Sequence, residues 1–242
     1  MWMEGSTSNA YRMWFQHMDI NRIPFYQYNT IIVGTGAAGL NAAVTLHKLG
    51  QKNIALITEG RYMGTSRNTG SDKQTYYKLT QCGSEPDSVR KMAETLFDGG
   101  CVDGDIAMAE AAGSLRAFYH LVDIGVPFPF NKSGEYVGYK TDHDPLKRGI
   151  SAGPLTSKYM TECLERQAEE RGIPFFDGYQ AVRLLTEEKN GEKWAAGIIA
   201  LNKRKAASAD ERYAVFSAVN IIWATGGEAG MYQASVYPVS QT

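Results

Sequence analysis

A glycine-rich turn between a strand and a helix constrains this chain more than any other feature of its sequence. Residues 31–33 form a short apolar, β-branched run, which is typical of a buried parallel strand. The spacing Gly34-x-Gly36-x-x-Gly39 follows directly, and residues 37–48 have the composition and apolar spacing of a helix. This order predicts the first half of a βαβ unit whose helix N-terminus faces a ligand.

The next stretch completes that unit. Gly50 ends the helix, residues 54–57 form a second apolar strand, and Glu59 stands about 20 residues beyond the glycine turn. The glycines allow a pyrophosphate to approach the backbone, the helix N-terminus supplies N–H groups and a positive dipole end, and the carboxylate can accept from a ribose hydroxyl. A bare glycine spacing is weak evidence in a chain with 25 glycines, but the complete unit predicts a dinucleotide site.

Composition places the chain among ordinary globular proteins. Its 242 residues are 43% hydrophobic and 21% charged with a net charge of −1, which argues against a nucleic-acid partner. No apolar run approaches the ~18 residues of a transmembrane segment, and no secretory signal is visible. Cys82, Cys101 and Cys163 lack metal-binding spacing, so we expect free thiols in a cytoplasmic protein.

A polar loop follows the second strand. Residues 60–73 are rich in Gly, Ser, Thr and Asn, and this composition alone suits an ordinary surface connection equally well. The loop leaves the carboxyl end of a parallel strand, however, and ligands of open α/β sheets lie at that edge. Its position therefore favours contact with a cofactor that runs outward from the glycine turn.

The middle of the chain reads as helical. We expect one helix from about Ser84 to Phe97, a second over 106–124 capped by Asp103, an irregular stretch over 127–153, and a third helix over 154–171. The apolar positions of the second helix are predicted to lie in the core: Ile106, Ala109, Leu115, Phe118, Leu121 and Val122.

One histidine invites a functional interpretation. His143 lies between two aspartates in the irregular stretch, where it could serve a metal or an acid–base site. No second cluster of ligands has matching spacing, so a solvated loop histidine is favoured and no metal site is predicted.

The last third of the chain changes to strands. After a strand that begins at Phe175, residues 181–187 and 194–201 are joined by an Asn-Gly pair, which is a strong signal for a tight hairpin. Residues 213–217 supply a third short strand, and residues 220–224 form a final apolar parallel strand. The predicted class is therefore α/β: a Rossmann-like domain with a parallel sheet and an antiparallel three-stranded β-meander. A plain NAD-binding Rossmann domain has no such meander.

The sequence resembles the FAD-binding domain of the fumarate reductase/succinate dehydrogenase flavoprotein family, which includes L-aspartate oxidase, flavocytochrome fumarate reductases and 3-ketosteroid dehydrogenases. Four stretches carry the resemblance: residues 32–40, the loop 64–71, Val182, and Ala-Thr-Gly-Gly at 224–227. We therefore expect an N-terminal extension over 1–28 and an FAD-binding domain over 29–242.

The resemblance implies particular contacts with FAD. The glycine turn would hold the pyrophosphate, Glu59 the adenosine ribose, and Val182 the adenine through its backbone. The loop 65–71 would lie along the ribityl chain and the flavin edge, and residues 224–227 would close over the ADP half. The expected FAD-binding residues are Gly34, Gly36, Ala37, Ala38, Gly39, Glu59, Gly60, Thr65, Ser66, Asn68, Thr69, Gly70, Ser71, Val182, Ala224, Thr225, Gly226 and Gly227.

Departures from the family pattern matter as well. Members with covalent flavin carry a histidine in the loop after the second strand, whereas residues 61–77 contain none, which implies non-covalent FAD. The usual Ala-x-Gly-Gly of that loop is replaced by Thr-Gly-Ser-Asp at 69–72. The family's capping domain, with the arginine and histidines that bind the substrate, would follow residue 242. We therefore expect no catalytic residue within this chain and no turnover by the chain alone.

Three functions compete on the sequence. The first is a flavin-dependent oxidoreductase that transfers hydride between FAD and an organic acid-like or enone substrate. The second is an NAD(P)-dependent Rossmann dehydrogenase, which the meander disfavours. The third is a catalytically silent dinucleotide-binding fragment. The substrate and the electron donor are left open.

Overall fold

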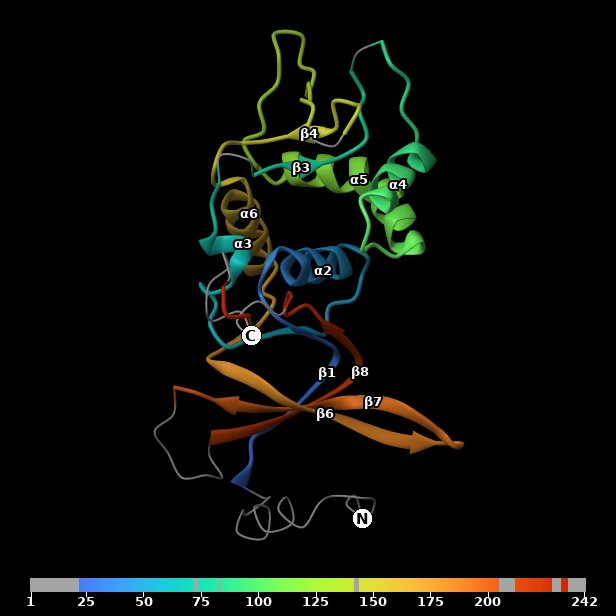
Figure 1. Ribbon diagram of the computed structural model, residues 1–242. Coiled ribbons are helices and arrows are strands. Elements are labelled where there is room, and N and C mark those ends of the chain that lie inside the picture. The colour runs from blue at the N-terminus through green and yellow to red at the C-terminus, as the bar shows by residue number, and fades with distance from the viewer. Residues whose placement is uncertain are drawn as a thin grey trace. The chain divides into compact units, whose positions relative to one another are not determined.

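The computed structural model describes residues 22–71, 74–82, 84–141, 144–204, 212–227 and 232–234. These residues form two compact units, which are treated separately below (Figure 1). The sheet unit comprises the described residues of 1–63 and 172–226, and the helical unit comprises those of 64–171 and 227–242. His143 lies outside the described residues.

A six-stranded sheet with the order β5-β2-β1-β8-β7-β6 forms the sheet unit. β5, β2, β1 and β8 are parallel, while β8, β7 and β6 form an antiparallel meander, which confirms the α/β class. Its elements are β1 (Phe25–Val33), α2 (Ala37–Lys48), β2 (Ile54–Thr58), β5 (Phe175–Asp177), β6 (Tyr179–Lys189), β7 (Glu192–Asn202) and β8 (Tyr213–Trp223).

The central strands are longer than the sequence indicates. The predicted strands 213–217 and 220–224 are one strand, β8, because pairing with β1 continues across the residues between them. The first part of β8 pairs with β7, and β8 pairs with β1 from Val215 to Trp223. β1 likewise begins at Phe25, well before the predicted strand 31–33, and pairs with β8 from that residue onward. β8 therefore links the parallel and antiparallel halves of the sheet.

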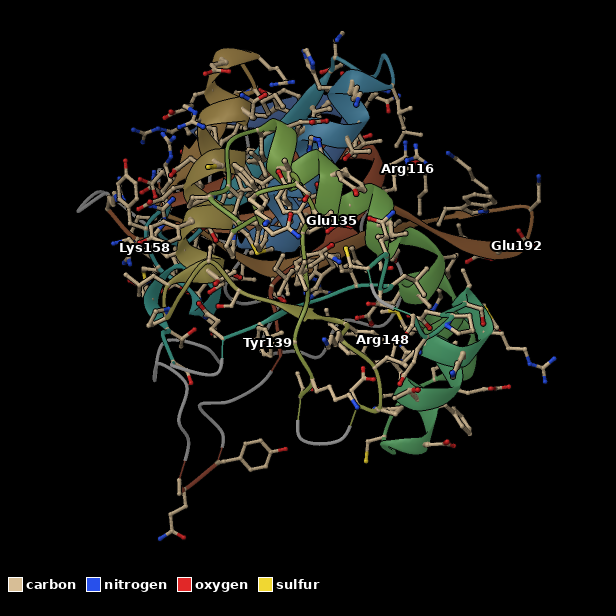
Figure 2. All side chains as sticks on the ribbon, turned by 90° about the horizontal axis from the view of Figure 1, so that it is seen from above. Arg116, Glu135, Tyr139, Arg148, Lys158 and Glu192 are labelled. Atoms are coloured by element: carbon tan, nitrogen blue, oxygen red, sulfur yellow. The ribbon has the colours of Figure 1, made fainter. Side chains whose placement is uncertain are left out.

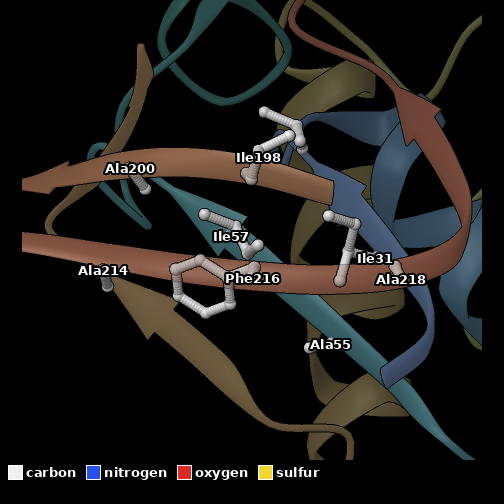
Figure 3. Close-up of a cluster of buried hydrophobic side chains, with 9 residues drawn as sticks. Ile31, Ala55, Ile57, Ile198, Ala200, Ala214, Phe216 and Ala218 are labelled. Atoms are coloured by element: carbon white, nitrogen blue, oxygen red, sulfur yellow. The ribbon is translucent and has the colours of Figure 1, made fainter. Parts of the chain in front are cut away.

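Alternating apolar side chains build the core on one face of this sheet (Figure 3). Ile31 and Ile57 of the parallel strands share this cluster with Ile198 of β7 and Phe216 of β8. The ring of Phe216 stacks on Tyr26 with centroids 5.0 Å apart. The parallel and antiparallel halves of the sheet thus share one apolar cluster.

Helix α2 packs against β1 and β2 and occupies the predicted range. It buries Gly39, Leu40, Ala43 and Val44, which form one stripe along the helix. The Asn-Gly hairpin is also confirmed, since Asn190 and Gly191 both have the positive φ that a type I′ turn requires (54° and 80°).

The helical unit holds three longer helices and a two-stranded sheet. The helix predicted from Ser84 begins only at Val89, because Ser88 caps it by accepting from the Lys91 amide (3.2 Å) and the Asp87 carboxylate is engaged by Arg148. The unit's elements are α3 (Thr65–Asn68), β3 (Tyr76–Tyr77), α4 (Val89–Asp98), α5 (Gly104–Asp123), β4 (Gly149–Ile150) and α6 (Thr156–Glu170).

Asp103 caps α5 as predicted, but the buried face of this helix was predicted only in part. Phe118 and Leu121 are buried, whereas Ile106 is 64% exposed and Ala109 is exposed. The small side chains at 107 and 111 turn toward Met92 and Ala93 of α4, which rotates the buried stripe away from Ile106. The buried residues of α5 are Ala107, Ala111, Ser114, Phe118 and Leu121.

Arg148, which is labelled in Figure 2, is completely buried and lies at the centre of a polar network in the helical unit. Its guanidinium donates to both carboxylate oxygens of Asp87 (2.9 and 2.7 Å) and to Thr95 Oγ1 (2.9 Å). It also reaches the Tyr77 hydroxyl (3.2 Å), which in turn donates to Asp144. Burial alone would lower the pKa of Arg148, but the hydrogen bonds to Asp87 and Tyr77 raise it above its ordinary value. The arginine therefore ties the loop before α4 to the segment before β4.

Two features are missing from the part of the chain that is described. No helix there combines the length and apolarity needed to cross a bilayer. No group of three His, Cys, Asp or Glu side chains among these residues is arranged to hold a metal ion.

Candidate functional site

The outer glycines of the turn after β1 are required by packing. Gly34 has φ 111°, and a Cβ there would lie 2.3 Å from the carbonyl oxygen of Ala224. A Cβ on Gly39 would lie 2.1 Å from the carbonyl oxygen of Gly34. These two positions let the turn, the start of α2 and the end of β8 meet at backbone distance.

Gly36 is different, because its backbone makes no such demand. As the N-cap of α2 it has φ −75° and ψ −177°, an extended conformation open to any residue. Gly36 itself has no side chain that could cap the helix, and the first amides of a helix have no intrahelical acceptor. Ala38, in the first turn, is exposed. An anion that approached the start of α2 would meet the positive end of the helix dipole.

The ends of three neighbouring strands are joined by backbone hydrogen bonds at this turn. The Gly34 amide donates to Ile57 of β2 (2.8 Å), and the Ala224 amide donates to Val33 of β1 (2.8 Å). The sheet unit thus brings the predicted stretches 34–39 and 224–226 together. Beyond Ala224, Thr225 and Gly226 are exposed, and Gly226 has φ 84°. Gly227, which belongs to the helical unit, is exposed as well.

Thr35 is a residue of the turn that the sequence did not single out. Its side chain is buried, and its hydroxyl donates to the Thr58 hydroxyl at the end of β2 (3.0 Å). It occupies a position where the glycine spacing accepts any residue, so the pattern itself carried no signal. This contact fixes the turn against the strand that carries Glu59.

Glu59 follows β2 directly and is partly exposed. Its carboxylate pairs with the ammonium of Lys203, which follows β7. Gly60 starts a tight turn in which its carbonyl accepts from the Met63 amide (3.0 Å), and a Cβ on Gly60 would lie 2.3 Å from Met63 Sδ. Sequence reasoning placed Glu59 correctly at a strand end but missed Lys203, whose partner lies far away in the chain.

Val182 lies in a β-bulge of β6. Ala181 pairs with Ala200 and Arg183 with Ile199, so Val182 is the extra residue that faces no partner in β7. It is 49% exposed. A bulge releases backbone groups from the strand ladder, and this suits the predicted recognition of a ligand by the backbone of Val182.

In the helical unit, the predicted loop 64–71 contains one turn of helix, α3, so the expectation of an irregular segment was only partly right. Gly64 starts this turn with φ 94°, and the hydroxyl of Thr69 closes it by donating to the Thr65 carbonyl (2.6 Å). Asn68 donates through its side chain to the Gly64 carbonyl (3.1 Å). These local bonds allow a short polar segment to hold a defined shape.

Helix α6 anchors this loop. Arg67 pairs with the buried Glu165 of α6, and the Ser71 amide donates to the Pro154 carbonyl (3.1 Å). Gly70 packs closely there, since a Cβ on it would lie 3.0 Å from the Pro154 oxygen. Ser66 is half-buried on the same turn. The loop is thus held by tertiary contacts that its composition did not reveal.

One hydroxyl of the loop has no partner in the described part of the chain. Thr65 Oγ1 is buried yet makes no hydrogen bond there. A buried hydroxyl without a partner is costly, and such groups in native proteins usually have an unseen ligand or water. Thr65 is therefore the residue of this loop that fits a bound group best.

Proteins of similar sequence match most of the chain. L-Aspartate oxidase of Agrobacterium fabrum is 27% identical over 215 residues, which cover 86% of this chain and 37% of that protein. The 8-methylmenaquinol:fumarate reductase flavoprotein subunit of Wolinella succinogenes is 27% identical, with 87% of this chain and 33% of that protein covered. The chain thus spans about a third of the length of these curated relatives.

Solved structures agree with the fold. A mutant of E. coli quinol fumarate reductase FrdA superposes with a TM-score of 0.75 at 20% identity, covering 89% of this chain and 35% of that one. The open form of a flavocytochrome fumarate reductase gives a TM-score of 0.68 at 19% identity, covering 95% and 38%.

A family model matches most of the chain and includes residues of both the sheet unit and the helical unit. The model of the family described as "FAD binding domain" matches residues 29–241, a range that contains the glycine turn, Glu59, the bulge at Val182 and the end of β8. The chain therefore belongs to this family of FAD-binding domains, of the fumarate reductase/succinate dehydrogenase flavoprotein type.

Proposed function

We propose that this chain is the FAD-binding part of a flavin-dependent oxidoreductase and that it holds FAD without a covalent bond. One observation carries the proposal: Gly36 begins α2 in an extended conformation that any residue can adopt, so the backbone itself does not require a glycine there. An approaching pyrophosphate gives a reason for that glycine, since any side chain would stand between the phosphates and the helix amides.

We assign each predicted stretch to one part of FAD. In the sheet unit, the turn 34–39 would hold the pyrophosphate, Glu59 the adenosine ribose, the bulge at Val182 the adenine, and residues 224–226 the ADP half. In the helical unit, the loop 65–71 would bind the flavin portion, and the buried Thr65 hydroxyl would gain there the partner it lacks among the described residues. FAD, when bound, would supply the hydride chemistry.

The relatives suggest the class of substrate. L-Aspartate oxidase, fumarate reductase and succinate dehydrogenase are named for organic acids. We propose that the protein carrying this domain exchanges hydride with an organic acid-like substrate, or with an enone. The free thiols of Cys82, Cys101 and Cys163 support a cytoplasmic location.

Non-covalent binding is directly testable. Because residues 61–77 contain no histidine for attachment, acid precipitation of the yellow protein is expected to release all flavin into the supernatant. The absorbance of the purified chain near the flavin bands tests the cofactor itself, since a nicotinamide nucleotide lacks those bands. Flavin retained in the washed pellet would contradict the non-covalent assignment, and a colourless chain that takes up no added FAD would contradict the proposed function.

Glu59→Ala is expected to weaken FAD binding about 10- to 100-fold, since a hydrogen bond to a charged acceptor contributes about 1.5–3 kcal/mol. FMN has no adenosine, so its affinity should not change. Glu188→Ala, which removes an exposed carboxylate near the hairpin end of β6, is the matched control and should bind FAD normally. Titration of flavin fluorescence measures the affinity of Glu59→Ala for FAD and for FMN, and the affinity of Glu188→Ala for FAD. An equal loss for FMN and FAD would exclude a role at the ribose.

A further inference from the structure

We propose that Lys203 is a positioning residue of the adenosine-ribose subsite: it neutralises and orients the Glu59 carboxylate that accepts from the ribose. The inference rests on the proposed function, because it concerns the FAD-binding role of Glu59. It concerns a residue in a part of the chain that no sequence motif connects with the glycine turn.

The backbone brings Lys203 to this place. Gly178, which follows β5, donates its amide to the Thr58 carbonyl at the end of β2 (2.9 Å). The Lys203 amide donates in turn to the Gly178 carbonyl (2.8 Å). These two bonds join the ends of β2, β5 and β7 through Gly178. The backbone of Lys203 is thereby held close to Thr58, the residue that precedes Glu59.

Two basic side chains that follow β7 form ion pairs with two different carboxylates. The ammonium of Lys203 pairs with Oε1 of Glu59. The guanidinium of the next residue, Arg204, pairs with Oδ2 of Asp177 (2.7 Å), whose Oδ1 accepts from the Arg61 amide (2.9 Å). The arginine is thus engaged by Asp177 at the end of β5, and among the described residues the lysine is the cation that contacts Glu59.

Lys203 can assist a carboxylate without displacing its ligand. An ionised carboxylate has about four acceptor positions on two oxygens, so an ammonium at Oε1 leaves Oε2 able to accept from a ribose hydroxyl. A bare carboxylate would also repel the pyrophosphate of the same ligand, and a cation beside it cancels that repulsion. We therefore expect Lys203 to favour FAD rather than compete with it.

Stability does not explain this pair. The side chains of Lys203 and Glu59 are 46% and 35% exposed, and ion pairs of that exposure contribute little to folding. The strand ends are held by the backbone bonds of Gly178, which survive the loss of the lysine side chain. A role in ligand binding is what remains for the pair.

Lys203→Met should therefore weaken FAD binding about 2- to 5-fold and leave FMN binding unchanged. Lys203→Arg should restore the affinity, because it keeps the charge. Arg204→Met removes the same charge from the adjacent residue but leaves Glu59 paired, so it should bind FAD as the unmodified chain does. Thermal unfolding without ligand should be the same for all of these variants.

A double-mutant cycle separates a positioning role from a general effect of charge. If Lys203 acts through Glu59, Lys203→Met should have no further effect on FAD affinity in the Glu59→Gln background. Equal losses for Lys203→Met and Arg204→Met, additive losses in the cycle, or unchanged or tighter FAD binding by Lys203→Met would each overturn the inference alone. Failure of the unmodified chain to bind FAD would overturn the proposed function and this inference with it.

Discussion

Gly36→Val is expected to abolish measurable FAD binding while the chain stays folded. The valine side chain would stand between the pyrophosphate and the first amides of α2. Loss of two charge-assisted hydrogen bonds weakens binding by about 100-fold or more. The fold should survive, because the backbone of Gly36 (φ −75°, ψ −177°) is open to a β-branched residue. Flavin fluorescence titration measures the affinity, and circular dichroism measures the fold.

Two further variants make that test specific. Gly36→Ala adds one methyl group and should lose less affinity than Gly36→Val. Gly34→Ala should instead damage the fold and lower the melting temperature, since φ is 111° and the new Cβ would lie 2.3 Å from the Ala224 oxygen. If Gly36→Val binds FAD with full affinity, the turn has a purely structural role and the proposed site is wrong.

Arg148→Met is expected to destabilise the helical unit strongly. Arg148 is 0% exposed, and its removal leaves the Asp87 carboxylate, 1% exposed at its side chain, without the cation that both of its oxygens contact. Breaking a buried ion pair from one side costs about 3–5 kcal/mol. Urea unfolding followed by the helical circular dichroism signal measures the loss. Arg90→Met is the matched control, since Arg90 and Glu94 form an exposed pair on α4 and should contribute almost nothing.

The same network predicts a pH dependence. Burial raises the pKa of the Asp87 carboxyl, but hydrogen bonds from Arg148 and from the Thr80 and Ser88 amides outweigh this and hold it below its ordinary value. A depressed pKa in the folded state stabilises the protein above the unfolded pKa of about 3.9, and that stabilisation is lost as the pH falls through the folded pKa. Asp87→Asn should lack this acid-dependent loss of stability. An equal acid dependence in Asp87→Asn would exclude Asp87 as its source.

Local signals in the sequence determined the elements nearest the site. Strand, glycine turn, helix and second strand were predicted over residues 31–57 because each depends on neighbours in the chain: continuous apolar runs, the glycine spacing, and a helix ended by Gly50. The Asn-Gly hairpin is equally local, since both residues must adopt positive φ whatever surrounds them.

Positions that depend on distant partners were fixed only by the tertiary structure. The joining of 213–217 and 220–224 into β8 comes from continuous pairing with β1, and the buried stripe of α5 is set by Met92 and Ala93 of α4. The burial of Lys78 could not be predicted from the sequence either, because lysine side chains are usually exposed. Lys78 is nevertheless buried, with its ammonium 5.0 Å from the centre of the Phe118 ring. This burial lowers the pKa of Lys78.

The candidate site divides in the same way. The glycine turn and the acid at the end of β2 were predicted from the sequence alone, because the pattern of a dinucleotide-binding unit specifies those residue types at that spacing. Only the tertiary structure decided that Thr35 bonds Thr58, that Val182 lies in a bulge, and that Lys203 meets Glu59. Each of these contacts depends on strand register or on a partner far along the chain, and residue spacing carries no information about either.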